Sequence, residues 1–304
     1  MSPDFAPATP PFMGAATALP ADAAIFAAPH GTPYAGIDNR AHAESARAIR
    51  DSLGHDREWV DHWNFDFGGT LLNDDRFRLA DLGDLKTSAG DGPGNRALIT
   101  AATKHVLAAG AVPIMIGGDD STPIPFLAGF ADHGPITILQ IDAHIDWRDE
   151  RRGERMGFSC TMRRASEMAH VERIIQVGMR GFGSARRAEV ETAKAWGAKF
   201  IPAREVHQSG IGAALDHVPA GAACVITIDC DALDPAIMPA VMAPAPGGLS
   251  YTQVTGMIAG VIGKARLAGF DMIEFVPGRD SHAIAATICA SIISYTVGSL
   301  ANRR

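Results

Sequence analysis

The sequence predicts an α/β fold in which a mostly parallel central sheet lies between two layers of helices. Short apolar runs alternate along the chain with helical segments, a pattern typical of a parallel sheet covered on both faces. Three of these runs, residues 112–116, 135–139 and 224–228, lead directly into clusters of aspartates. Because ligands of open α/β sheets bind beyond the carboxyl ends of the strands, these clusters also indicate where a site is expected.

The predicted strands are short apolar runs, several of them rich in β-branched residues and bounded by glycine or proline. In order, they cover residues 24–28, 112–116, 135–139, 174–178, 198–201, 224–228 and 269–277. The predicted helices have helical periodicity or begin with Ser/Thr followed by proline, as at residues 121–123. In order, they cover residues 41–53, 93–109, 123–131, 162–168, 187–196, 251–267 and 284–300.

The domain organisation is expected to be simple. Residues 1–22 are rich in alanine and proline and are predicted to form an irregular N-terminal arm. Residues 23–304 contain no linker or internal repeat and are predicted to form a single domain. The polar segment 147–157 is expected to form a loop over the site, and the Gly/Pro loop after residue 28 carries His30, which could serve the site or only stabilise that loop.

Composition excludes several classes of partner. The net charge of −7, with no basic cluster beyond Arg151-Arg152 and Arg163-Arg164, argues against a nucleic-acid partner. No run of 18 apolar residues is evident, so no membrane span is expected. The four cysteines have no paired metal spacing and are interpreted as reduced core thiols, which favours a cytoplasmic protein.

The aspartate clusters have the spacing of a metal site. Alternate side chains of an extended chain point to the same side, so groups two residues apart converge at a strand end. The converging groups are Asp120, Asp142, His144, Asp146, Asp229 and Asp231. One divalent ion does not need so many ligands, whereas two ions that share carboxylates would use them all. The alternative is that they are ordinary caps and turns at strand ends.

The motifs around these residues resemble those of the ureohydrolase family of arginases and agmatinases. The family signatures Gly-Gly-Asp-His-Ser, Asp-Ala-His-x-Asp and Ser-x-Asp-x-Asp-x-x-Asp-Pro correspond here to residues 117–121, 142–146 and 227–235. Their order and separation also match, and the resemblance extends from about residue 28 to about residue 293. It implies the arginase-like three-layer αβα fold and a single ureohydrolase domain.

The resemblance also implies roles for individual residues. Asp142 and Asp229 would bridge two ions, with Asp120 and Asp146 completing one ion and His144 and Asp231 the other. The family usually uses Mn(II), sometimes Ni(II) or Zn(II), and oxygen-rich ligands suit Mn(II).

Two further carboxylates are candidates: Asp234, shortly after the strand at residues 224–228, and Glu274, near the end of the last predicted strand. Asp234 would lie behind the ligands or orient the amine leaving group. Glu274 would pair with the substrate guanidinium, a planar cation that a carboxylate can bind with two hydrogen bonds; the alternative is an ordinary surface glutamate.

The sequence departs from the family at two positions. Asp120 stands where the family mostly has histidine, which adds negative charge and leaves one ion with oxygen ligands only. Phe158 stands where the family commonly has a histidine thought to move protons, and no histidine lies between His144 and His170. His282 is a candidate replacement by chain position, because an imidazole suits proton transfer; a structural role is the alternative.

The function implied is hydrolysis of a small guanidino compound to urea and an amine by a metal-bridging hydroxide. Agmatine is the first expectation for the substrate and a guanidino acid such as 4-guanidinobutyrate the second. The two departures motivate an alternative, a non-catalytic paralogue that acts as a structural or regulatory subunit. By resemblance, the chain is expected to form a homo-oligomer, a trimer or hexamer.

Overall fold

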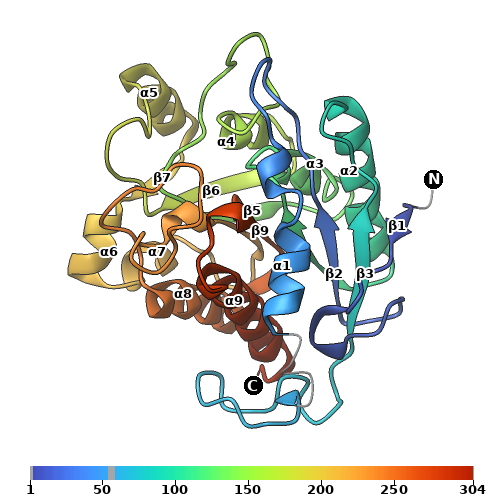
Figure 1. The fold of residues 1–304 in the computed structure, drawn as a ribbon. Helices are drawn as coiled ribbons and strands as arrows, with labels where there is room; N and C mark the ends of the chain where they lie inside the picture. The colour runs from blue at the N-terminus through green and yellow to red at the C-terminus, as the bar shows by residue number, and fades with distance from the viewer. Residues whose placement is uncertain (1–2, 54–58, 304) are drawn as a thin grey trace.

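The computed structural model describes residues 3–53 and 59–303, which are built around a nine-stranded sheet (Figure 1). The strand order is β1-β3-β2-β4-β9-β8-β5-β6-β7, and all neighbouring strands are parallel except β1 and β3. The strands are β1 (Phe5–Ala6), β2 (Ala23–Ala28), β3 (Leu79–Leu85), β4 (Val112–Gly117), β5 (Ile136–Ile141), β6 (Val171–Val177), β7 (Lys199–Ile201), β8 (Ala223–Asp229) and β9 (Arg266–Ile273). The predicted mostly parallel sheet is confirmed.

Helices cover both faces of the sheet (Figure 1). The α-helices are α1 (Ser45–Ser52), α2 (Gly92–Ala108), α3 (Pro123–Ala128), α4 (Thr161–Ala165), α5 (Arg187–Trp196), α6 (Ala203–Ser209), α7 (Gly212–Leu215), α8 (Tyr251–Lys264) and α9 (Ile284–Ala301). Helices α1 and α6 to α9 share a core with Ile25 and Ile226, and α2 to α5 share a second core with Phe26 and Met115. Adjacent strand residues thus enter opposite cores, which confirms the three-layer αβα arrangement.

The N-terminal arm is more ordered than the sequence predicts. Phe5–Ala6 add an antiparallel strand to β3, and the ring of Phe12 is fully buried. The backbone N–H of Phe12 donates to Asp81 Oδ2 at 2.8 Å, and the same carboxylate is held by the buried Arg50. The expectation of an irregular arm is therefore wrong for these residues. The strand pairing, the buried ring of Phe12 and its hydrogen bond to Asp81 anchor the arm, and an Ala/Pro-rich composition reveals none of them.

Several element boundaries differ from the prediction near the site. The expected helix 41–53 is divided into a 3-10 turn, η2 (Arg40–His42), and helix α1. Strand β9 begins three residues before the predicted start and ends at Ile273, so Glu274 lies just beyond it with a φ of 65°. Helices α6 and α7 are not predicted at all; they are short, and the break between them is at Gly210.

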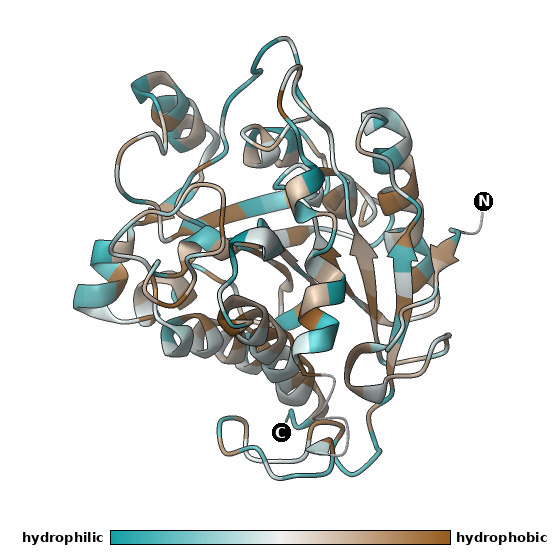
Figure 2. Cartoon of the chain, viewed as in Figure 1, coloured by the Kyte–Doolittle hydropathy of each residue, from teal (hydrophilic) through white to brown (hydrophobic). Residues whose placement is uncertain are grey.

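Helix α9 is the one helix among the described residues that is long and apolar enough to cross a membrane. Its 18 residues have a mean hydropathy of 1.7, although three serines, two threonines and a tyrosine interrupt the apolar residues. Figure 2 shows almost no hydrophilic residue along it. It packs against α1 and α8, and 61% of the segment is buried within the protein, as is also typical of a core helix.

Candidate metal centre and cavity

The three aspartate motifs meet at one edge of the sheet. Strands β4, β9, β8 and β5 are consecutive neighbours and all parallel, so their carboxyl ends lie together. Asp120 follows β4, Asp142 follows β5, and Asp229 ends β8. Glu274 follows β9, which runs between two of the motif strands. The topology thus gathers these four carboxylates, although up to 154 residues separate them in the sequence.

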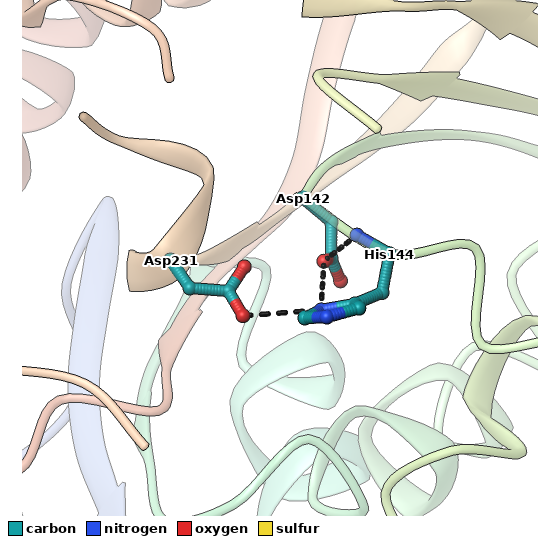
Figure 3. A group of neighbouring side chains, drawn as sticks. All are labelled: Asp142, His144 and Asp231. Carbon is teal, nitrogen blue, oxygen red and sulfur yellow. Dashed lines mark hydrogen bonds and ion pairs between the residues drawn. The ribbon is translucent and has the colours of Figure 1, made fainter. Parts of the chain in front are cut away.

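The gathered side chains form two overlapping groups with the size of a metal site. In each group, the potential ligand atoms lie within 4.8 Å of one another. One group is Asp142, His144 and Asp231, and the other is Asp120, Asp142 and Asp229. In Figure 3 the first group converges, with His144 Nδ1 3.1 Å from Asp231 Oδ2 and 3.4 Å from Asp142 Oδ1. Asp142 belongs to both groups, as expected of a carboxylate shared by two ions.

Asp146 lies beside these groups rather than within either of them. It lines the same cavity, and its Oδ2 accepts a hydrogen bond from Gln140 Nε2 at 2.8 Å. The same Gln140 nitrogen donates to Asp142 Oδ2 at 2.8 Å, and Gln176 Nε2 in turn donates to the side-chain amide oxygen Oε1 of Gln140. Two buried amides therefore hold the two aspartates in place, an arrangement typical of the partners that orient metal ligands.

The charges of the cluster favour a cation. Burial, followed by the charges of neighbouring aspartates, raises the pKa values of Asp120, Asp146 and Asp229 well above their ordinary range. Burial alone would lower the pKa of His144, but hydrogen bonds to Asp142 and Asp231 outweigh it and raise that pKa to about 12.

The pKa values of the remaining two carboxylates, Asp231 and Asp142, are shifted in opposite directions. Burial and the charge of Asp142 raise the pKa of Asp231 to about 6. Burial also acts to raise the pKa of Asp142, but the hydrogen bond and charge of His144 lower it. Asp120 Oδ2 is buried and has no hydrogen-bond partner among the described residues. Crowded carboxylates and an orphaned oxygen are the environment that a bound divalent ion would satisfy, so these residues fit a metal site.

Glu274 is held from two sides. Its Oε1 accepts from the backbone N–H of Asp120 at 2.8 Å, and its Oε2 lies 3.0 Å from His42 Nε2. His42 is buried at the end of η2 and lines the same cavity, and its Nδ1 faces the carbonyl of Asn39 at 3.4 Å. His42 was not among the residues predicted from the sequence. Its only sequence signal is a histidine that follows the first strand-end loop, the loop in which His30 was the candidate.

Two predicted catalytic residues lie elsewhere. Asp234 accepts from the backbone N–H groups of Ala236, Gly247 and Gly248, each at 2.9 Å, so it braces the loop after β8 and does not line the cavity. Of the two roles considered for Asp234, this placement favours a position behind the ligands over contact with the amine leaving group. His282 is exposed at the turn before α9 and is not a cavity residue, and His30 instead binds Thr87.

The cavity above the cluster has a volume of about 230 Å³. The lining residues at the sheet edge, called the inner end below, are the aspartates, His144 and Glu274; the lining residues from the loops, called the outer end, include Arg151 and Phe158. Phe158 thus lies at the site, as expected from the sequence, but as an apolar wall. Arg180, which the sequence did not predict as a site residue, donates to the backbone carbonyls of Asp231 and Ala245 and so connects the loops after β8.

The chain is similar to known guanidino-compound hydrolases. It is 30% identical to an N(1)-aminopropylagmatine ureohydrolase of Thermus thermophilus over 207 residues, 67% of either chain. It is 28% identical to the human mitochondrial guanidino acid hydrolase over 221 residues. That match covers 71% of this chain but only 62% of the human protein, less than two thirds of its length.

Solved structures show the same fold. The agmatine ureohydrolase of Thermoplasma volcanium has a TM-score of 0.78 and 26% identity, over 93% of this chain and 90% of that one. Proclavaminate amidinohydrolase from Streptomyces clavuligerus has a TM-score of 0.80 at 24% identity, over 99% of both chains. A model of the Arginase family matches residues 21–298. With this match added to the motif geometry, the chain belongs to the arginase family.

Proposed function

We propose that the protein hydrolyses a small guanidino compound to urea and an amine. The observation that carries this proposal is the pair of ligand groups that share Asp142, in the same cavity as Glu274. Water adds its oxygen to the guanidino carbon, the bond from that carbon to the alkylated nitrogen breaks, and the departing amine takes up a proton. The names of relatives, which include agmatinase and guanidinobutyrase, agree with this class of reaction.

The ligand groups would hold two divalent ions. Asp142 would be shared, with His144 and Asp231 on one side and Asp120 and Asp229 on the other. Ions bound there would lower the pKa of a water molecule and so supply the nucleophile. We propose Mn(II) because the ligands are almost all oxygens. A formiminoglutamase of Trypanosoma cruzi with the same fold was solved with Mn2+.

Glu274 would bind the guanidinium of the substrate. Its carboxylate is fixed by Asp120 N–H and by His42, and each carboxylate oxygen keeps a second lone pair for a planar cation. His42 would position this carboxylate. Because the side chains of His42 and Glu274 are only 4% and 13% exposed, the ion pair with the substrate would be stronger there than at the surface.

The non-catalytic alternative is less well supported by the arrangement of the site. Asp120, the departure that motivates it, joins Asp142 and Asp229 in a compact group instead of turning away. A cytoplasmic homo-oligomer, trimer or hexamer, remains part of the proposal on resemblance alone.

Urea release tests the proposal. The purified protein is reconstituted with Mn(II), and separately with Ni(II), and given agmatine, arginine, 4-guanidinobutyrate, 3-guanidinopropionate and guanidine. We expect urea from at least one compound and none after chelation of the metal. A protein that binds metal and releases no urea from any of them contradicts the proposed activity. A protein that binds no metal favours the non-catalytic subunit.

A further inference from the structure

Arg151 differs from its neighbours in the loop over the site. Arg148 Nε lies 3.8 Å from Glu189, and Arg155 pairs with Asp149 at 2.9 Å. Arg152 donates to the carbonyl of Ala35. Within residues 3–53 and 59–303, the Arg151 guanidinium has neither an ion pair nor a side-chain hydrogen bond, although it lines the cavity. A cation that faces an enclosed space without a partner is a ready site for an anion.

Two aromatic rings hold this guanidinium in place. It lies 5.4 Å from the centre of the Tyr34 ring and 5.6 Å from that of Phe158, and the two rings pack edge to face at 4.6 Å. Tyr34 is itself fixed, because its buried hydroxyl accepts from the Ser159 N–H at 3.0 Å. Gly157 allows this packing, since a Cβ there would be 2.3 Å from the Tyr34 ring. The rings therefore pre-orient the arginine without neutralising it.

The cavity has opposite charges at its two ends. The inner end carries Glu274 and the aspartates of the metal centre. At the outer end, Asp38 is paired with Arg40 at 2.9 Å, and Glu189 faces Arg148. Among these charged side chains, and within the described residues, Arg151 has no ion-pair partner. A ligand complementary to both ends has a cation at one end and an anion at the other.

We propose that Arg151 forms a distal carboxylate subsite and that the protein acts on ω-guanidino carboxylic acids in preference to agmatine. This inference rests on the proposed function. The guanidinium of such an acid meets Glu274, and its carboxylate can accept two hydrogen bonds from Arg151. The distal ammonium of agmatine would instead meet a like charge. The order of substrates expected from the sequence is thereby reversed.

Phe158 contributes to this subsite by positioning Arg151. It stands where the family commonly has a histidine, and here its ring is one of the two that hold Arg151. A protonated imidazole at that position would repel the guanidinium, whereas a phenyl ring attracts it. Phenylalanine in place of the family histidine thus removes a titratable group and supplies an aromatic face on which the Arg151 guanidinium lies.

The test compares two substrates of similar length, 4-guanidinobutyrate and agmatine, with the protein of residues 1–304 loaded with Mn(II). We expect the wild type to have the higher kcat/KM for the acid. Arg151→Met should lower kcat/KM for the acid by about 10- to 100-fold, the range for losing a hydrogen bond between charged groups. It should leave the value for agmatine unchanged or raised, and Arg151→Glu should favour agmatine further. Arg155→Met, whose partners lie outside the cavity, is the matched control and should change neither value.

The outcomes separate the two proposals. Preference of the wild type for agmatine, or an equal loss of both activities in Arg151→Met, overturns the subsite while the proposed function stands. If neither compound is hydrolysed, the proposed function fails for these substrates, and calorimetric binding of 4-guanidinobutyrate decides the subsite. Weaker binding to Arg151→Met than to the wild type then supports it, and equal binding overturns it.

Discussion

The inner and outer ends of the cavity are built in different ways. At the inner end, ligands follow adjacent parallel strands, and buried amides such as those of Gln140 and Gln176 hold them. At the outer end, the side chains come from loops. They are positioned by aromatic rings such as that of Tyr34 and by long ion pairs such as that between Arg148 and Glu189. The inner end holds the residues proposed to bind metal and the guanidinium, and the outer end holds the proposed carboxylate subsite. Substitutions should therefore have different signatures at the two ends.

The largest effect is expected for Asp142→Asn. Asp142 is the carboxylate shared by both ligand groups, so its loss should impair the binding of both ions. We expect activity to fall by more than about 100-fold, beyond the range typical of residues that only orient metal ligands. Metal content by plasma emission spectroscopy and urea release check this for every substrate.

Asp234→Asn is the control for Asp142→Asn. This carboxylate lies beyond the end of β8, as Asp142 lies beyond the end of β5, but it is outside the cavity. We expect metal content close to that of the wild type and, at most, a loss of stability from the loop that it braces. Full metal content in Asp142→Asn would show that the shared carboxylate is not needed.

A smaller effect is expected for His42→Ala. Glu274 would lose its 3.0 Å partner and with it a fixed orientation. We expect KM to rise about tenfold for every guanidino substrate, as for the loss of one hydrogen bond to a charged group, with kcat less affected. His42→Gln should restore part of the loss. His30→Ala, on a half-buried histidine outside the cavity, is the control, and an unchanged KM in His42→Ala would contradict the role of His42.

The His42–Glu274 pair also predicts how stability depends on pH. Burial alone would lower the pKa of His42, but the charge of Glu274 and the hydrogen bond to it raise that pKa from 6.5 to about 9. A raised pKa in the folded state stabilises the fold fully below pH 6.5 and no longer above about pH 9. At 1.36 kcal/mol for each pKa unit, the stabilisation is roughly 3 kcal/mol.

Urea denaturation of the metal-free protein measures this. The free energy of unfolding of the wild type, relative to His42→Gln, should fall between pH 6.5 and pH 9. A difference that stays constant over this range would show that His42 does not carry the charge assigned to it. Asp119, which also acts on His42, is present in both proteins and affects the comparison equally.

The smallest effect is expected at the rim. The Phe182 side chain is fully exposed, next to Gly183 and Ser184 of the cavity. Phe182→Ser should change the free energy of unfolding by no more than about 0.5 kcal/mol, as is usual for surface substitutions. Thermal or urea denaturation checks this. A loss well above that value would show that the rim, like the inner end, is part of the packed structure.

The sequence allowed the inner end to be predicted better than the outer end. Strand ends are local signals, so the spacing of Asp142, His144 and Asp231 could be read directly, and parallel topology brings them together. The role of His42 depends on a contact between residues 232 positions apart, which no local pattern encodes. Arg151 is one of several arginines in a polar loop, and only the folded chain shows that its neighbours are paired.

The end of the last strand was predicted incorrectly for a related physical reason. Glu274 looked like part of the last strand because the apolar run continues around it. In the fold it has a left-handed φ of 65°, a conformation that a non-glycine residue adopts only where surrounding contacts impose it. Its hydrogen bonds to Asp120 N–H and His42 supply such contacts.

The hydrogen bond from Asp120 N–H to Glu274 has a consequence for how the site is loaded. The carboxylate assigned to the guanidinium also fixes the backbone of a proposed metal ligand. Occupation of either position would favour the arrangement that the other requires, so the two binding equilibria would be thermodynamically linked. Linkage is reciprocal: whatever factor the ions add to the affinity for substrate, substrate adds to the affinity for the ions. When the metal is scarce, protein molecules with bound substrate would then retain it better than protein molecules without substrate.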